Sequence, residues 1–208
     1  MPTTRIRGLY VIIDPDACSG RDAVDVARLA LEGGASILQW RDKRRDKGDQ
    51  LPDAQAVREL CRERPALFIA NDHVDLALAL DADGVHLGQR DLPLAAARKL
   101  VPPGFIVGVS TNNVDEARQA RRDGASYIAV GSVFPTGSKD LTRPASPQRL
   151  REVKAAADLP VVAIGGINAG NIDEVLAAGA DAVAVISAVC AAGDVRAAAQ
   201  ELAARFEP

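Results

Sequence analysis

The stretch GASYIAVGS, residues 124–132, contains the features that decide the fold. Gly124 follows a helical segment, and glycine is favoured there because it readily adopts the left-handed conformation that ends many helices. The apolar run 127–130 is short and continuous, as in a parallel strand that is covered on both faces. A polar loop begins at Gly131. The stretch therefore predicts a passage from a helix into a buried strand and out into a loop.

The same lead-in, a glycine or its counterpart followed by small residues, precedes three other predicted strands. It appears as GAS at 34–36, DADG at 81–84 and GAD at 179–181. Other strands begin instead near Pro65, Pro103 and Pro160. This alternation indicates a repeating module of two strand–helix units, although helix capping alone also explains the glycines.

Short β-branched runs alternate with helical segments rich in Ala, Leu and Arg along the chain. The predicted strands are 9–13, 36–40, 67–70, 84–87, 106–109, 127–130, 161–164 and 182–186. The predicted helices lie near 22–32, 52–62, 73–80, 92–100, 113–122, 146–157, 170–178 and 194–204. Eight strand–helix units predict an α/β fold, a single (β/α)8 TIM barrel that forms one domain over residues 1–208. A doubly wound sheet usually has fewer strands and a glycine-rich turn after the first one, and 14–20 carries no such fingerprint.

The composition excludes several classes of function. The 208 residues are 48% hydrophobic and 25% charged, which suits one well-filled core. A net charge of −3 argues against a general nucleic-acid binder, and no apolar run suits a signal peptide or a membrane span. Three widely spaced cysteines fit reduced thiols. We therefore expect a cytoplasmic protein without nucleic-acid or membrane partners, and a homo-oligomer stays among the open alternatives.

Polar residues collect just after the predicted strands, where the active site of such a barrel lies. Gln39, Arg41 and Lys43 alternate at the end of the second strand, so we expect them to face one side. An amide, a guanidinium and an ammonium at this spacing suit a polyanion. The alternative is a solvated charge run, because charged residues continue through 44–47.

Two aspartates follow neighbouring strands. Asp72 comes after the third strand beside Asn71, and Asp91 comes after the fourth. Adjacent parallel strands lie about 5 Å apart, so the two carboxylates can share one Mg²⁺ together with substrate phosphates. Alternatively, each aspartate caps the helix that follows it. His86 either packs in the barrel or contacts a ligand, and Ser110 after the fifth strand either binds phosphate or caps a helix.

The loop GSVFPTGSK, 131–139, resembles a phosphate cradle but is not a Walker A loop. That motif places lysine directly after its second glycine, whereas here Ser138 separates Gly137 from Lys139. Backbone amides with the Thr136 and Ser138 hydroxyls suit one phosphate, and Lys139 can reach another.

The loops after the seventh and eighth strands are the recurrent phosphate site of this fold. They contain Gly165 and Gly166 in one loop and Ile186 and Ser187 in the other. Glycine lets backbone amides approach an anion closely, although turn glycines without a ligand are the alternative. One site with a cationic half and a neutral half implies a diphosphate on one substrate and a monophosphate on another.

Taken together, seven motifs resemble the thiamine phosphate synthase family. They are QWRDK at 39–43, ND at 71–72, GVHLGQRD at 84–91, GVS at 108–110, GSVFPTGSK at 131–139, AIGGI at 163–167 and AVIS at 184–187. The resemblance covers nearly the whole chain. It implies a transferase that joins hydroxymethylpyrimidine diphosphate to hydroxyethylthiazole phosphate, carboxylated or not, and forms thiamine phosphate and pyrophosphate with Mg²⁺. Its partners would be these two small phosphorylated heterocycles.

The resemblance also implies residue roles. It assigns the pyrimidine diphosphate to Gln39, Trp40, Arg41, Asp42, Lys43, Asn71, Ser110 and Lys139, with Arg41, Ser110 and Lys139 acting in catalysis. It assigns the thiazole phosphate to Thr136, Gly137, Ser138, Gly166, Ile186 and Ser187, and Mg²⁺ to Asp72 and Asp91. The chain departs from the family at Ser138, where a second threonine is usual, and at Ala129, where glycine is expected. The implied mechanism is dissociative, with departure of pyrophosphate before attack by the thiazole nitrogen.

Two rival functions use the same barrel. A thiazole tautomerase-like isomerase needs neither the diphosphate half nor the metal half. A non-catalytic sensor of phosphate ligands would have lost part of the charged set. That set is complete in this chain, with Arg41, Lys43, Asp72, Asp91 and Lys139. The sequence therefore favours the synthase.

Overall fold

The computed structural model describes residues 6–136 and 144–206. Its strands form a closed barrel in chain order, and every neighbouring pair is parallel, including the pair that joins β8 to β1. The strands are β1 (Gly8–Ile13), β2 (Ile37–Trp40), β3 (Leu67–Asn71), β4 (Gly84–Leu87), β5 (Ile106–Thr111), β6 (Tyr127–Val130), β7 (Val161–Ile164) and β8 (Ala182–Val185). The predicted (β/α)8 barrel is confirmed.

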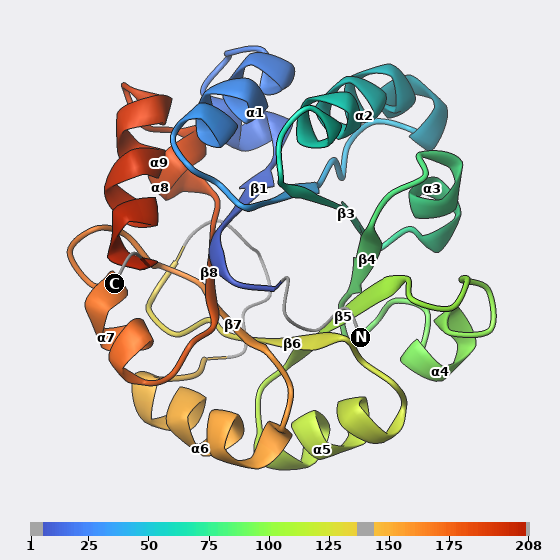
Figure 1. Cartoon of the computed structure of the whole chain (residues 1–208), viewed down its shortest axis with the longest axis vertical. Coiled ribbons are helices and arrows are strands. Elements are labelled where there is room, and N and C mark those ends of the chain that lie inside the picture. The colour runs from blue at the N-terminus through green and yellow to red at the C-terminus, as the bar shows by residue number, and fades with distance from the viewer. Residues whose placement is uncertain (1–5, 137–143, 207–208) are drawn as a thin grey trace.

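Helices surround the ring of strands, and α9 lies beside α1 where the ring closes (Figure 1). The helices are α1 (Ala23–Glu32), α2 (Lys47–Arg62), α3 (Val74–Ala79), α4 (Leu94–Ala97), α5 (Val114–Arg122), α6 (Pro147–Ala157), α7 (Ile172–Ala177), α8 (Ser187–Cys190) and α9 (Val195–Ala203). Two 3-10 turns, η2 (Pro15–Cys18) and η3 (Ala204–Phe206), complete the elements of residues 6–136 and 144–206.

Three helical elements differ from the prediction. Helix α2 begins at Lys47 and continues through Pro52, whereas the predicted helix lay near 52–62. Proline is tolerated in the first turn of a helix. The turn of α8 was not predicted, since four residues are too few to show a helical period. Helix α4 spans only Leu94–Ala97 of the predicted 92–100.

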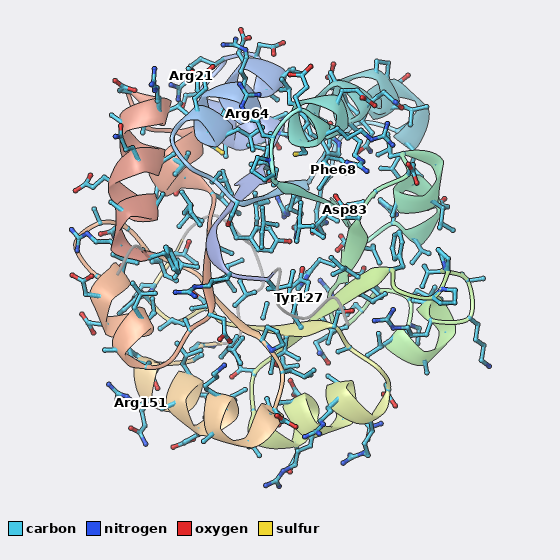
Figure 2. The ribbon with its side chains drawn as sticks, viewed as in Figure 1. Arg21, Arg64, Phe68, Asp83, Tyr127 and Arg151 are labelled. Carbon is cyan, nitrogen blue, oxygen red and sulfur yellow. The ribbon has the colours of Figure 1, made fainter. Side chains whose placement is uncertain are left out.

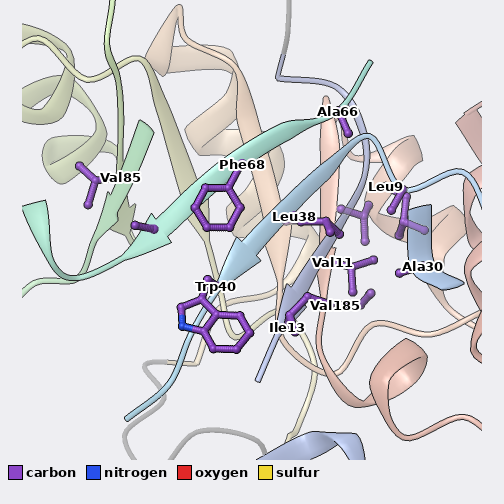
Figure 3. Close-up of a cluster of buried hydrophobic side chains, with 14 of the residues drawn as sticks. Leu9, Val11, Ile13, Ala30, Leu38, Trp40, Ala66, Phe68, Val85 and Val185 are labelled. Atoms are coloured by element: carbon purple, nitrogen blue, oxygen red, sulfur yellow. The ribbon is translucent and has the colours of Figure 1, made fainter. Parts of the chain in front are cut away.

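The strands are buried on both sides, which explains their continuous apolar runs. On β1, Leu9, Val11 and Ile13 belong to the core between strands and helices, whereas Tyr10 and Ile12 belong to the core inside the barrel. Figure 3 shows Trp40 on β2 and Phe68 on β3 within the outer core. Alternate residues of each strand therefore enter different cores.

The lead-ins that precede even-numbered strands are left-handed, as predicted. Gly34, Gly124 and Gly179 have φ values of 96°, 89° and 93°, and Asp81 has a φ of 49°. The last small residue of each lead-in then binds the preceding strand. Asp83 Oδ2 accepts from Phe68 N at 2.9 Å, Ser126 Oγ from Val107 N at 3.1 Å and Asp181 Oδ2 from Val161 N at 2.7 Å.

The pair β1 and β2 is joined in a similar way, but here the side chain donates the hydrogen bond instead of accepting it. Ser36 Oγ donates to Leu9 O at 3.2 Å, and the Ser36 amide donates to the same oxygen. Each even strand is thus joined by a side chain to the odd strand before it. The alternation in the sequence therefore reflects a module of two strands, and helix capping accounts for only part of it.

Candidate active site

A cavity of about 960 Å³ opens at the carboxyl ends of the strands. Residues from the ends of β2 to β8 and the loops that follow them line it, among them Arg41, Lys43, Asn71, Asp72, His86, Asp91, Ser110, Thr136, Gly166, Ile186 and Ser187. The fold thus brings most of the predicted site residues to one place. Gly137, Ser138 and Lys139 lie outside the described residues.

Two cations of the β2 loop reach the cavity. Arg41 forms an ion pair with Asp14, and both side chains are largely buried. Lys43 is half-exposed, with its Nζ 3.2 Å from Asp72 Oδ2. Gln39 lies deeper in the barrel, because it precedes Arg41 by two residues on the same side of the strand. Its Nε2 donates to the Tyr10 hydroxyl at 2.6 Å inside the barrel.

The side chains of Trp40 and Asp42, two residues predicted to bind substrate, point away from the cavity, and their contact with substrate stays a prediction. Trp40 belongs to the outer core, and its Nε1 donates to Gln50 Oε1 at 2.9 Å. Asp42 accepts from the amides of Arg44 and Arg45 and from Arg45 Nε at 2.5 Å. The reason is the alternation of the strand, which sends these two residues to the helix side. They hold the loop that carries Arg41.

Asp42 is accordingly an anchored carboxylate. Burial raises the pKa of Asp42, but the hydrogen bonds from Arg45 and Arg44 outweigh burial and hold the pKa below its usual value. Arg45 also lies 5.9 Å from the Trp40 ring centroid. Part of the predicted charge run is therefore structural, since Arg45 joins the loop to α2 through Asp53.

Asp72 and Asp91 lie side by side at the rim, as their positions predicted. Burial and the Asp72 carboxylate raise the pKa of Asp91. Burial also raises the pKa of Asp72, but bonding to Asp91 and the Lys43 ammonium outweigh it and leave the pKa lowered. Two carboxylates this close share a proton or a cation.

Neither aspartate caps a helix. His73 is the N-cap of α3 and Pro93 that of α4, so the capping alternative fails. Asp72 adopts a left-handed φ of 61°, and Asp91 Oδ2 accepts from Gly88 N at 2.7 Å. In the described ranges 6–136 and 144–206 no third His, Cys, Asp or Glu joins them. A cation here would need water or ligand oxygens to complete its shell.

His86 and Ser110 connect the cavity to the barrel interior. His86 Nε2 lies 3.0 Å from Ser110 Oγ, and its Nδ1 lies 3.0 Å from the Tyr127 hydroxyl. His86 therefore both lines the cavity and packs against Tyr127, with ring centroids 5.6 Å apart. Ser110 is not a helix cap, because Asn113 occupies that position on α5.

The other half of the cavity is built from uncharged loops. Phe134 N donates to Gly165 O and Val133 N to Ile164 O, both at 3.0 Å, which joins the loops after β6 and β7. Asn171 Nδ2 donates to Gly166 O at 2.9 Å. Gly166 has a φ of 67°, and a Cβ there would lie 2.5 Å from Pro135 O. Glycine is therefore required where the two loops meet.

Sequence reasoning missed three residues of this site. Asp14 follows the first strand, so the rule that selected the other polar residues would also have found it. Tyr10 and Tyr127 lie within apolar runs, and nothing in those runs separates them from core residues. Figure 2 shows Tyr127 near the middle of the ring of strands.

The chain is similar to proteins of one family over most of its length. The profile of a family described as thiamine monophosphate synthase matches residues 9–189. The chain belongs to this family. The described residues of the charged half and of the uncharged half of the cavity both lie within the range that matches the thiamine monophosphate synthase family.

Two curated relatives and one solved structure illustrate the similarity. The thiamine-phosphate synthase of Methanoculleus marisnigri is 52% identical over 95% of this chain and 94% of its own length. That of Moorella thermoacetica is 50% identical over 93% of each chain. The thiamine phosphate pyrophosphorylase structure from Pyrococcus furiosus is 43% identical, covers 95% of this chain and 94% of its own, and has a TM-score of 0.88.

A more distant structure shares the fold alone. It is a 3-hexulose-6-phosphate synthase with 20% identity and a TM-score of 0.69, which covers 96% of this chain and 100% of its own. As a member of the thiamine monophosphate synthase family, the chain is a transferase of thiamine biosynthesis. Within the described ranges, every helix is too short or too polar to cross a bilayer.

Proposed function

We propose that this enzyme joins hydroxymethylpyrimidine diphosphate to hydroxyethylthiazole phosphate, carboxylated or not, and releases pyrophosphate. The observation that carries the proposal is the division of one cavity into two halves. The Asp72–Asp91 pair and the cations Arg41 and Lys43 stand in one half, and the uncharged loops stand in the other. A diphosphate fits the first half and a monophosphate the second.

The diphosphate half uses several kinds of donor. Arg41 presents a planar fork that Asp14 orients, and Lys43 supplies a mobile point charge. Asn71 and Ser110 line the same half. From the resemblance, Lys139 joins them, although it lies outside the described residues. These groups would hold the diphosphate and stabilise the charge that develops as it leaves.

Asp72 and Asp91 fit a magnesium ion. Their carboxylates lie within hydrogen-bonding reach of each other, and the like charge raises the pKa of Asp91, which a divalent cation would relieve. When bound, Mg²⁺ neutralises diphosphate oxygens and makes pyrophosphate a better leaving group. The two aspartates would hold the ion. The Lys43 ammonium would exchange its contact with Asp72 for one with the diphosphate of the substrate.

The uncharged half would take the thiazole phosphate. Thr136, Gly166, Ile186 and Ser187 line it, and the resemblance adds Gly137 and Ser138 outside the described residues. Uncharged donors suit a group that is bound but not transferred, because they need not change their interactions during the reaction.

The proposed reaction is a dissociative substitution. The carbon–oxygen bond to the diphosphate breaks first, and pyrophosphate leaves with the bonding electrons while the pyrimidine ring stabilises the cation. The thiazole nitrogen then donates its lone pair and forms the carbon–nitrogen bond. A carboxylated thiazole must in addition lose its carboxyl group as CO2, which leaves the bonding electrons on the ring carbon, and that carbon takes up a proton. The protein contributes orientation and electrostatic stabilisation through Arg41, Ser110 and Lys139, without a covalent enzyme intermediate.

The test is turnover with both purified substrates, followed by release of pyrophosphate and formation of thiamine phosphate. We expect activity that excess chelator abolishes and added Mg²⁺ restores, and Asp72→Asn should lose most of it with the fold intact by circular dichroism. Full activity in chelator would contradict the metal role. Thiazole isomerisation without use of the diphosphate would contradict the proposed reaction.

A further inference from the structure

A chain of polar side chains runs through the barrel interior to the cavity. Gln39 Nε2 donates to the Tyr10 hydroxyl at 2.6 Å, and Tyr10 Oη lies 3.1 Å from Tyr127 Oη. Tyr127 Oη lies 3.0 Å from His86 Nδ1, and His86 Nε2 lies 3.0 Å from Ser110 Oγ. Both tyrosines and Gln39 are almost completely buried, so each must satisfy its hydrogen bonds within this chain.

The backbone at Gly108 leaves room for this series of hydrogen-bonded side chains. Gly108 on β5 lies in register with His86 on β4 and with Tyr127 on β6. A Cβ on Gly108 would overlap the Tyr127 ring and lie 2.5 Å from its hydroxyl. The tyrosine ring thus crosses β5 over the glycine to reach the imidazole, and a larger residue at 108 would prevent the contact.

Counting protons shows which group donates in each hydrogen bond of this series of side chains. Burial raises the pKa of both tyrosines, so each hydroxyl keeps its single proton. Gln39 already donates to Tyr10, and Tyr127 is the partner that the described structure offers for the Tyr10 proton. The Tyr127 proton is then directed at His86 Nδ1, because its oxygen accepts from Tyr10. The opposite direction would leave the buried Tyr10 hydroxyl proton without an acceptor, which is unfavourable.

We propose that Tyr10 and Tyr127 are positioning residues that fix His86 as the Nε2–H tautomer and thereby make Ser110 a hydrogen-bond donor to the diphosphate. His86 Nε2 then donates to Ser110 Oγ, so the serine proton is available to an acceptor in the cavity that Ser110 lines. In the Nδ1–H tautomer, the Ser110 hydroxyl would donate its proton to His86 Nε2 and would present only lone pairs to an anion.

The tautomer is measurable in the protein without substrate. The chain has only two histidines, so His73→Asn leaves a single imidazole in a sample labelled with ¹⁵N on its histidines. We expect His86 Nδ1 to give the chemical shift of an unprotonated ring nitrogen and Nε2 that of a protonated one. A protonated Nδ1 would overturn the proposal.

Two matched variants test the cause of the tautomer. Tyr127→Phe removes the hydroxyl that touches Nδ1, and we expect the Nδ1 signal to move toward that of a protonated nitrogen. Tyr10→Phe removes the donor that directs the Tyr127 proton but leaves the Tyr127 hydroxyl beside Nδ1, so the signals should move in the same direction by a smaller amount. An unchanged spectrum in Tyr127→Phe would show that its hydroxyl does not fix the tautomer.

The role of Ser110 rests on the proposed function, because it needs an anionic ligand. With inorganic pyrophosphate and Mg²⁺ as the probe, Ser110→Ala should weaken binding on the order of fivefold, the factor expected for one hydrogen bond. Tyr127→Phe should weaken it as well, but should add nothing in the Ser110→Ala background. Additive losses would overturn the coupling. Wild-type protein that fails to bind pyrophosphate would count against the proposed function, and the spectra would still decide the tautomer.

Discussion

The ion pair between Asp14 and Arg41 shows what one residue outside the expected set contributes. Both side chains are largely buried, at 9% and 13% exposure, so the guanidinium is held in one orientation at the rim of the cavity. An arginine fork binds a diphosphate well only when it is aimed correctly, because its donors are fixed in one plane.

Asp14→Asn should therefore lower turnover about tenfold, since a charge-assisted bond to Arg41 is replaced by a weaker neutral one. The matched control is Asp16→Asn, which removes an exposed partner of the exposed Arg44 and should leave turnover unchanged. The measurement is steady-state kinetics with each substrate varied. Equal effects of the two variants would contradict a special role for Asp14.

The Asp72–Asp91 pair makes the metal response depend on pH. The folded-state pKa of Asp91 is raised, so its contribution to stability is present at low pH and is lost as pH rises through that pKa. Mg²⁺ binds the deprotonated pair. The rise in melting temperature caused by Mg²⁺ should hence be largest at neutral pH and shrink on acidification.

Asp91→Asn should remove this Mg²⁺ response and leave the metal-free protein at least as stable as the wild type at neutral pH. Asp75→Asn changes a nearby exposed acid that pairs with Lys47, and it should keep the response. Thermal unfolding with and without Mg²⁺ across pH measures both. A full Mg²⁺ shift in Asp91→Asn would place the ion elsewhere.

The sequence predicted the residues whose role follows from their position just after a strand. It did not predict those whose role depends on which face of the strand the side chain points to. Arg41, Asp72 and Asp91 were predicted because polar residues after strands stand out. The sequence did not show that the Trp40 side chain points away from the cavity, since both faces of these strands are apolar and the run does not show which face meets the cavity. Tyr10 was missed for the same reason.

At the scale of elements, the side chain of each lead-in fastens one strand to its neighbour. Asp83 accepts from Phe68 N and also lies near Arg58, so it serves β3 and α2 together. Asp83→Ala should lower the free energy of unfolding by about 1–3 kcal/mol, because a buried amide loses its acceptor. Asp83→Asn keeps an oxygen at that position and should lose less. Chemical denaturation measures the difference, and equal losses would assign the effect to charge.

The junction of the loops after β6 and β7 should be sensitive to one methyl group. Gly166→Ala adds a Cβ 2.5 Å from Pro135 O at a left-handed backbone position, so the loops must separate. We expect the Michaelis constant for the thiazole phosphate to rise much more than that for the pyrimidine diphosphate. Gly193→Ala meets no atom within 4 Å and is the control. Equal rises for both substrates would indicate general damage to the barrel.

At the scale of the whole molecule, the fold shields its thiols. Cys18, Cys61 and Cys190 are free and buried, and burial raises the pKa of Cys61 to about 12. A thiol reagent should react slowly with the native protein at neutral pH and with all three cysteines after unfolding. Leu100→Cys, at a side chain that is 58% exposed, should react at once as a positive control. Fast reaction of the native wild type would show that a buried segment opens readily.

The closed barrel and its order of strands followed from the sequence, because alternation and capping repeat along the chain and errors at single boundaries do not change the count. The boundaries of α2 and the turn of α8 did not follow. Pro52 resembles a helix start but is tolerated further inside, and a four-residue turn leaves no periodic trace.

The side-chain hydrogen bonds at the lead-ins also have an evolutionary consequence. They lie at the amino ends of the strands, whereas the cavity lies at the carboxyl ends, so selection for folding and selection for chemistry act on different residues of the same strands. A lineage can therefore exchange its upper loops for others while the lower rim keeps the frame intact. The 3-hexulose-6-phosphate synthase structure, at 20% identity, shares this barrel fold over almost its entire length.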